Sequence, residues 1–145
     1  MKKAVETQLK TNVAIKVRFS ETDSMSVVWH GNYIRYFEDA REAFGDMYGI
    51  TYLDVFSNGY YMPLVSLSCD YKSSLRYGDE ALAEITFWNT PSAKAIFKYR
   101  IFNKTTNRLA ATGSTIQVFL SVSDNALSIN NPAFFENWKQ KMGLL

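Results

Sequence analysis

Residues 17–48 read VRFSETDSMSVVWHGNYIRYFEDAREAFGDMY, and their spacing of apolar side chains predicts a strand that leads through a loop into a long helix. Residues 11–19 alternate between apolar and polar side chains, which is typical of a half-buried strand. The apolar face of this strand would comprise Val13, Ile15, Val17 and Phe19. From residue 31 onward apolar side chains recur at helical spacing, and Gly49 supplies a stop for the helix.

Beyond the long helix the sequence predicts more strands and a second helix. Residues 51–59 are ambiguous and could include a short helical turn. Four strand-like blocks follow, at about 60–75, 79–89, 93–104 and 108–122, with turn residues between them. Neighbours joined by such short turns are expected to pair antiparallel. A C-terminal helix is expected from Ala133 to Lys141, just after Pro132.

The order of one strand, one long helix and four further strands predicts an α+β layer fold. A helix with this apolar stripe needs a sheet to cover it. A bent antiparallel sheet that wraps around the helix would bury both the stripe and the apolar face of the sheet. With 145 residues, 47% of them hydrophobic, the chain is expected to form a single domain over residues 1–145. Its core is expected at about 13–122 and its terminal helix at about 132–141, while residues 1–11 are expected to fray.

Composition argues against several classes of protein. The net charge is +2 and the basic residues are spread singly, without the basic stripe of a nucleic-acid binder. Cys69 is the one cysteine and His30 the one histidine, which excludes an internal disulfide and leaves few ligands for zinc. The N-terminal sequence MKKAVETQLK lacks an apolar signal segment, and no apolar run is long enough to span a membrane. The expected location is therefore the cytoplasm.

The loop between the first strand and the long helix carries the residues best suited to chemistry. Asp23 precedes a helix start near His30 and Gly31. Backbone N–H groups at a helix start lack intrahelical partners and lie at the positive end of the helix dipole. They suit a carbonyl oxygen that becomes negative during a reaction. A carboxylate facing such N–H groups is a minimal layout for acyl-group hydrolysis, although loop aspartates more often cap helices and lone histidines are more often structural.

The segment VRFSETDSMSVVWHGNYIRYFEDAREAF resembles the signature of the hotdog-fold acyl-coenzyme A thioesterases. It is most similar to the 4-hydroxybenzoyl-coenzyme A thioesterase-like family and its Tol–Pal-associated branch. The matching positions are Asp23, Val28, His30, Asn32, Tyr33, Phe37, Glu38, Ala40 and Arg41. Weaker matches lie at 63–65, 76–79 and 112–119, so the resemblance covers about residues 13–122.

This resemblance implies a fold, a reaction and a set of site residues. The fold is a bent antiparallel sheet of about five strands around one central helix, and the reaction is hydrolysis of an acyl-coenzyme A or acyl-carrier thioester. Asp23 would be nucleophile or general base, and His30 would assist through its backbone N–H or its imidazole. Substrate-binding roles are expected for Gly31, Asn32, Tyr33, Glu38 and Arg76. No metal or redox cofactor is implied, because coenzyme A is part of the substrate, and the expected assembly is a dimer or a tetramer of two dimers.

Simpler structural roles compete with these functional ones. Asn32 is well suited to cap the helix, and Glu38 to pair with Arg41 on the helix surface. Two residues depart from the family pattern: Ser26 replaces a common glycine and Ser74 a common proline. A non-catalytic acyl-thioester binding module and a hotdog-fold hydratase or dehydratase therefore stay open as alternatives, as does the identity of the acyl group.

Overall fold

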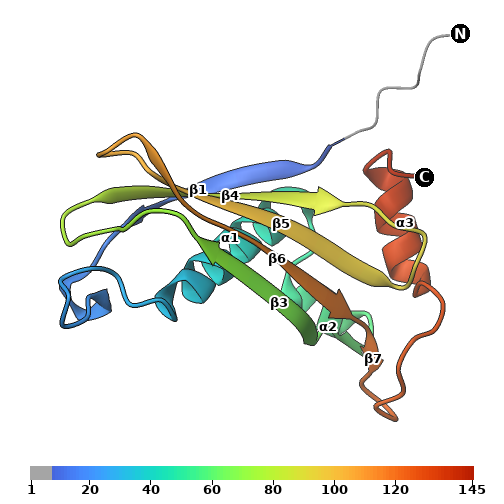
Figure 1. Cartoon of the computed structure of the whole chain (residues 1–145). Coiled ribbons are helices and arrows are strands. Elements are labelled where there is room, and N and C mark those ends of the chain that lie inside the picture. Colours follow the sequence, from blue (N-terminus) through green and yellow to red (C-terminus); the bar gives the residue numbers. More distant parts are fainter. Residues whose placement is uncertain (1–7) are drawn as a thin grey trace, which may run out of the picture.

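In the computed structural model, which describes residues 8–145, a five-stranded antiparallel sheet curves around the long helix α1 (Asn32–Tyr48) (Figure 1). The strands are β1 (Lys10–Lys16), β3 (Leu64–Tyr71), β4 (Glu80–Trp88), β5 (Lys94–Asn103) and β6 (Arg108–Val118). Their order in the sheet is β1-β4-β5-β6-β3, so β1 and β3 form its two edges. The predicted α+β class and the antiparallel sheet are confirmed.

Shorter elements complete the fold. One turn of 3-10 helix, η1 (Phe19–Glu21), follows β1, and α2 (Tyr52–Ser57) forms in the stretch 51–59, whose sequence is ambiguous. Strands β2 (Tyr60–Tyr61) and β7 (Leu120–Ser121) pair in a separate two-stranded sheet. The C-terminal helix α3 (Ala133–Lys141) occupies the predicted residues and lies beside one end of the sheet (Figure 1).

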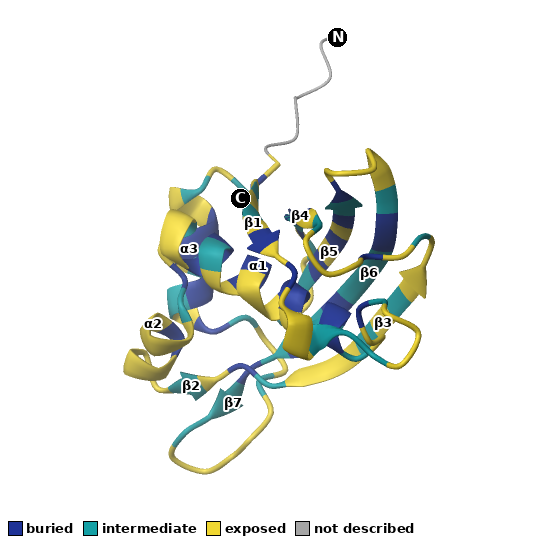
Figure 2. Ribbon diagram, turned by 90° about the vertical axis from the view of Figure 1, so that its left-hand side faces the viewer, coloured by how far each residue is buried: buried dark blue, intermediate teal, exposed yellow. Residues whose placement is uncertain are grey.

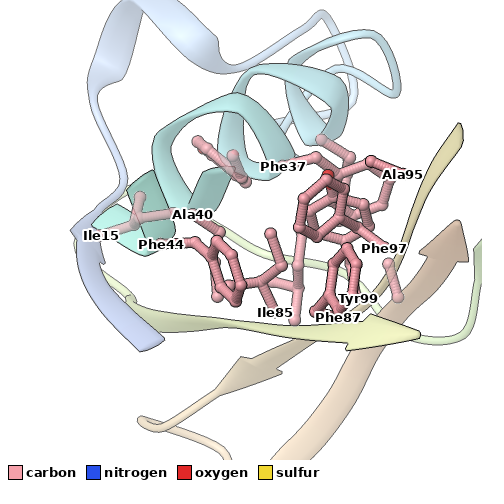
Figure 3. Packing of buried hydrophobic residues seen from close by; sticks show 14 of the residues in the cluster. Ile15, Phe37, Ala40, Phe44, Ile85, Phe87, Ala95, Phe97 and Tyr99 are labelled. Carbon is pink, nitrogen blue, oxygen red and sulfur yellow. The ribbon is translucent and has the colours of Figure 1, made fainter. Parts of the chain in front are cut away.

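The core lies between α1 and the concave face of the sheet. Phe37 and Phe44 of α1 are both buried against the strands, and Phe37 stacks on Tyr99 of β5 with ring centroids 4.4 Å apart (Figure 3). Along β5 buried residues alternate with more exposed ones, as a sheet with one covered face requires (Figure 2). The helix ends as predicted at Gly49, whose φ of 70° is left-handed and free of strain for glycine.

Two predictions about the strands are wrong. The alternation places Phe19 on the buried face of the first strand, but Phe19 lies in η1 and is 75% exposed, because the chain turns after Val17. The turn at 77–79 predicts that the strands on either side of it pair, yet β3 pairs with β6 while β4 pairs with β1 and β5. The connection instead crosses the end of the sheet, where Leu75 is fully buried and its carbonyl accepts the N–H of Val28.

The predicted fraying of the N-terminus is wrong for the part of it that the structure describes. Leu9 is buried and Lys10 already pairs with Thr86 of β4. Residues 1–7 lie outside the described range. Among residues 8–145, none of the helices has the length and apolar character needed to cross a bilayer.

Candidate active site

The loop between η1 and α1 is fastened to the helix through Glu21. The Glu21 carbonyl accepts the N–H of Trp29 and the side-chain Nδ2 of Asn32, each at 2.9 Å. Its carboxylate accepts the hydroxyl of Tyr36 at 3.0 Å. These contacts hold both ends of the loop against the first turns of α1, so the loop presents Asp23 from a defined position.

Asp23 is half-buried in this loop and has one free carboxylate oxygen. Its Oδ1 accepts the N–H of Met25 at 2.8 Å, and its own N–H donates to the carbonyl of Val27 at 2.9 Å. Ser26 closes the turn with a φ of 63°, a left-handed conformation that glycine, the residue common here in the family, adopts without strain. The Oδ2 atom has no hydrogen-bond partner within residues 8–145, which leaves it available to water or substrate.

The start of α1 offers unpaired backbone N–H groups beside this carboxylate. Gly31 occupies the cap position with helical dihedral angles, and no side chain caps the helix. The capping role predicted for Asn32 is therefore wrong, because its side chain turns back to the loop. Within the described chain, the N–H groups of His30 and Gly31 donate to no protein acceptor. Two donors without a protein acceptor thus lie at the positive end of the helix, where a negative oxygen would be favoured, and their role as an oxyanion site stays a prediction.

Asp23 and His30 line one pocket of about 290 Å³. The remaining residues in its wall are Met25, Val27, Val28, Tyr33, Tyr71, Lys72, Ser73 and Ser74. The loop, the helix start and the end of edge strand β3 thus meet at a single place. Of the predicted site residues, Asp23, His30 and Tyr33 are brought together here.

Gly31 adjoins the pocket and makes room for a tryptophan. A Cβ atom at this position would lie 2.2 Å from the Trp29 ring, so the indole packs directly over the helix start. Its ring centroid is 4.9 Å from that of His30, which limits how far the imidazole can turn. The glycine here serves close packing, because its dihedral angles are ones that any residue adopts.

The other predicted site residues lie away from this pocket. Asn32 is buried, Glu38 is exposed on α1, and Arg76 opens the turn between β3 and β4, where its N–H donates to the Asp79 carboxylate at 2.9 Å. Their substrate-binding roles stay predictions. The surface ion pair expected between Glu38 and Arg41 is wrong: Arg41 is 1% exposed and donates to a backbone carbonyl beneath the helix.

No sequence pattern singles out Tyr71, yet it forms part of the pocket wall. It is the last residue of β3, and its hydroxyl donates to the carbonyl of His30 at 2.8 Å. Its ring meets Tyr33 edge to face, with centroids 5.0 Å apart. Burial, together with the neighbouring Cys69 and Tyr33, raises the pKa of Tyr71 to about 12, so the hydroxyl is a donor at neutral pH. Tyr71 reaches the pocket because β3 ends at this residue, and the pattern of apolar and polar residues in β3 does not predict where the strand ends.

Other hollows and clusters offer less chemistry. A larger groove of about 710 Å³ runs between β1, η1 and α1, but it contains neither Asp23 nor His30. Charged residues of both signs line it, among them Arg18, Arg35 and Asp39. Within residues 8–145, no three His, Cys, Asp or Glu side chains cluster in a way that could hold a metal ion. The Asp23 pocket is therefore the candidate active site.

Comparisons with known proteins agree with this fold. Residues 17–138 match the family model described as the thioesterase-like superfamily. The Bacillus subtilis protein named "Putative acyl-CoA thioesterase YneP" is 34% identical over 89 residues, which span 61% of this chain and 64% of that protein. A 1,4-dihydroxy-2-naphthoyl-CoA hydrolase from Prochlorococcus marinus is 28% identical over 129 residues, covering 85% of this chain and 84% of the relative.

A solved structure extends the agreement to three dimensions. The DHNA-CoA thioesterase from Staphylococcus aureus superposes with a TM-score of 0.82 and 29% sequence identity. The superposition covers 92% of this chain and 89% of the other. The hotdog fold implied by the sequence resemblance is confirmed.

Proposed function

Because the chain belongs to the thioesterase-like superfamily, as its match over residues 17–138 shows, we propose that it hydrolyses acyl-coenzyme A to a free acid and coenzyme A. The family predicted from the sequence is confirmed by this match. One observation supports the proposed reaction: Asp23, whose Oδ2 is free within residues 8–145, lines one pocket with His30, and the unpaired N–H groups of His30 and of the next residue, Gly31, lie at this helix start.

In the proposed reaction, Asp23 either attacks the thioester carbonyl carbon or removes a proton from an attacking water. The carbonyl oxygen becomes an oxyanion and accepts hydrogen bonds from the N–H groups of His30 and Gly31. One such donor contributes about 3 kcal/mol of transition-state stabilisation in other enzymes. The carbon–sulfur bond then breaks, and the thiolate of coenzyme A leaves and takes up a proton. On the nucleophilic route, water then hydrolyses the aspartyl anhydride and returns Asp23 to its starting state.

An Asp23→Asn variant tests the proposal by release of free thiol. Asparagine keeps the size of the side chain and its bond to Met25, but cannot act as a base or as an anionic nucleophile. We expect the rate to fall by about 10²–10⁴-fold. Asp124→Asn is a matched control, since Asp124 makes the same contact to the N–H two residues on, at 2.9 Å, outside the pocket.

Three results would contradict the proposal at different points. If the wild-type protein releases no thiol from any acyl-coenzyme A in a broad panel, the reaction is wrong and a binding module becomes the better hypothesis. If Asp23→Asn keeps the wild-type rate while folded, the reaction stands and the assignment of Asp23 fails. Loss of 2-enoyl-coenzyme A without thiol release would indicate a hydratase.

We further propose that the acyl group is aromatic. The rings of Tyr33 and Tyr71 stand edge to face in the pocket wall, which suits contact with a planar group. One of the similar proteins is named a 1,4-dihydroxy-2-naphthoyl-CoA hydrolase and another a DHNA-CoA thioesterase. Comparison of kcat/KM for aromatic, short-chain and long-chain substrates tests this, and equal or greater values for the long chains would contradict it.

We also propose that two copies pair along the outer edge of β3, and that two such dimers can form a tetramer. Within residues 8–145 this edge has no strand partner, and it exposes the apolar side chains of Leu64 and Val65. An exposed apolar edge strand is a ready template for pairing with another chain. Light scattering should show a dimer or tetramer for the wild type and a monomer for Val65→Lys, because a lysine at a strand edge opposes pairing.

The proposed chemistry needs no metal or redox cofactor, because a carboxylate and backbone N–H groups supply the base and the oxyanion site. Treatment with a metal chelator should therefore leave the rate unchanged.

We propose a cytoplasmic location, which is consistent with the single Cys69 and with coenzyme A thioesters as substrates. Cell fractionation tests this location.

A further inference from the structure

Tyr71 links the edge strand β3 to the N-terminal end of helix α1 through a hydrogen bond. Its hydroxyl donates to the His30 carbonyl at 2.8 Å, across 41 residues of sequence. Both residues line the Asp23 pocket. The phenol ring is held from two sides, since it stands edge to face with Tyr33 at 5.0 Å and with His30 at 6.4 Å between centroids. The hydroxyl therefore reaches the carbonyl from a fixed direction.

The acceptor of this bond belongs to the same amide as the N–H of Gly31. A trans peptide is planar, so its C=O and N–H point in opposite directions. Gly31 has helical dihedral angles, φ −68° and ψ −22°, and its unpaired N–H therefore points out of the helix start. Fixing the His30 oxygen fixes the plane of this amide and, with it, the direction of the N–H.

A hydrogen bond on a carbonyl also strengthens the N–H of the same amide as a donor. Estimates of this cooperative effect are about 10–30% per bond. No side chain caps the helix at this end, so within residues 8–145 the Tyr71 hydroxyl makes the one side-chain hydrogen bond to this amide. A preorganised donor costs no reorganisation when charge develops on the substrate oxygen.

We propose that Tyr71 is a positioning residue, whose hydroxyl holds the His30–Gly31 amide so that the Gly31 N–H donates to the oxyanion. This inference rests on the proposed thioesterase function. In this role Tyr71 helps to stabilise the transition state and does not bind the substrate, because its hydroxyl already donates to the carbonyl of His30.

Tyr71→Phe removes the hydroxyl and keeps the ring. We expect kcat to fall about tenfold, less than the 10²–10³-fold loss seen when an oxyanion donor is removed outright. KM should change less than twofold, because the interaction acts only in the transition state. Tyr77→Phe is the matched control: Tyr77 is 64% exposed, packs on Phe19, and lies outside the Asp23 pocket. Both kinetic constants of this control should equal those of the wild type.

The split between kcat and KM decides the kinetic test. An unchanged kcat in folded Tyr71→Phe would overturn the proposal. A higher KM with unchanged kcat would also overturn it, because the hydroxyl would then serve substrate binding.

A second measurement does not need catalysis and so separates this inference from the proposed function. In a ¹H–¹⁵N spectrum the Gly31 amide proton should shift upfield in Tyr71→Phe and stay in place in Tyr77→Phe. If the wild type hydrolyses nothing, the proposed function fails, while this shift still tests the link between Tyr71 and the amide. An unmoved Gly31 signal in Tyr71→Phe contradicts that link.

Discussion

Gly113 in β6 lies where the central helix presses on the sheet, and we predict that Gly113→Ala destabilises the protein. An added Cβ would lie 2.5 Å from Cζ of Phe37 and 2.6 Å from the backbone oxygen of Ser68. Ordinary contacts begin near 3.4 Å, so the new Cβ would lie about 0.9 Å too close to the Phe37 ring. Phe37 cannot easily yield, because it is 1% exposed and stacked on Tyr99.

The size of the effect follows from two opposing contributions. Overpacking in a closed core costs about 1–3 kcal/mol. Replacing glycine by alanine in a strand returns about 0.5–1 kcal/mol through the lower entropy of the unfolded chain. The expected loss in the free energy of unfolding is thus about 1–2 kcal/mol, or a fall of about 3–8 °C in Tm for a chain of this size.

Urea denaturation and thermal melting followed by circular dichroism measure this loss. A Phe37→Leu background is the control, since leucine lacks the ring atom that meets the new Cβ. Gly113→Ala should then cost less than it does in the wild type, with a coupling of at least about 0.5 kcal/mol. A Gly113→Ala protein as stable as the wild type would refute the packing argument, and equal costs in both backgrounds would refute the role of Phe37.

Three further predictions concern the loop and the helix. Gly31→Ala should keep the free energy of unfolding within about 1 kcal/mol of the wild-type value, because the Trp29 ring that meets the new Cβ is 49% exposed and can move aside. The kcat should nevertheless fall, because the substitution disturbs the start of the helix. Melting and steady-state kinetics on one sample check this contrast, and a large loss of stability would contradict it. Ser26→Gly should raise stability by about 0.5 kcal/mol, since relief of a left-handed serine outweighs the extra chain entropy; a lower Tm would contradict this. Burial, and then the nearby Glu42, raise the pKa of Asp39 above its ordinary 3.8, so the folded state binds this proton more tightly and loses stability as pH rises through that pKa. Asp39→Asn should therefore be more stable than wild type by about 0.3 kcal/mol at pH 7, in line with exposed charge interactions, and the gain should vanish below pH 3.8; an equal gain at low pH would exclude the electrostatic cause.

The local elements were predictable because short-range spacing determines them. The stripe that includes Phe37 and Phe44 defines α1, and Gly49 ends it at the predicted residue. The loop with Asp23 and the helix start near His30 and Gly31 follow from the same stretch. Each of these features depends on residues within a few positions of one another.

Errors arose where a residue's partner is distant in sequence. Asn32 has the side chain of a helix cap, but the Glu21 carbonyl competes for it. Arg41 carries a charge that usually stays at the surface, yet it lies under the helix between the rings of Tyr52 and Phe97. Neither competition can be weighed until the fold has brought the partners together.

The sequence by itself determined the family, the helix with its glycine stop, and a carboxylate at residue 23 ahead of free helix-start amides, because all of these arise from local spacing and a contiguous motif. Only the tertiary structure decided that β3 pairs with β6 at the sheet edge and that Tyr71 reaches the His30 carbonyl. Strand order depends on which apolar faces close the core most completely. That is a property of the whole packed chain, and no turn of three residues encodes it.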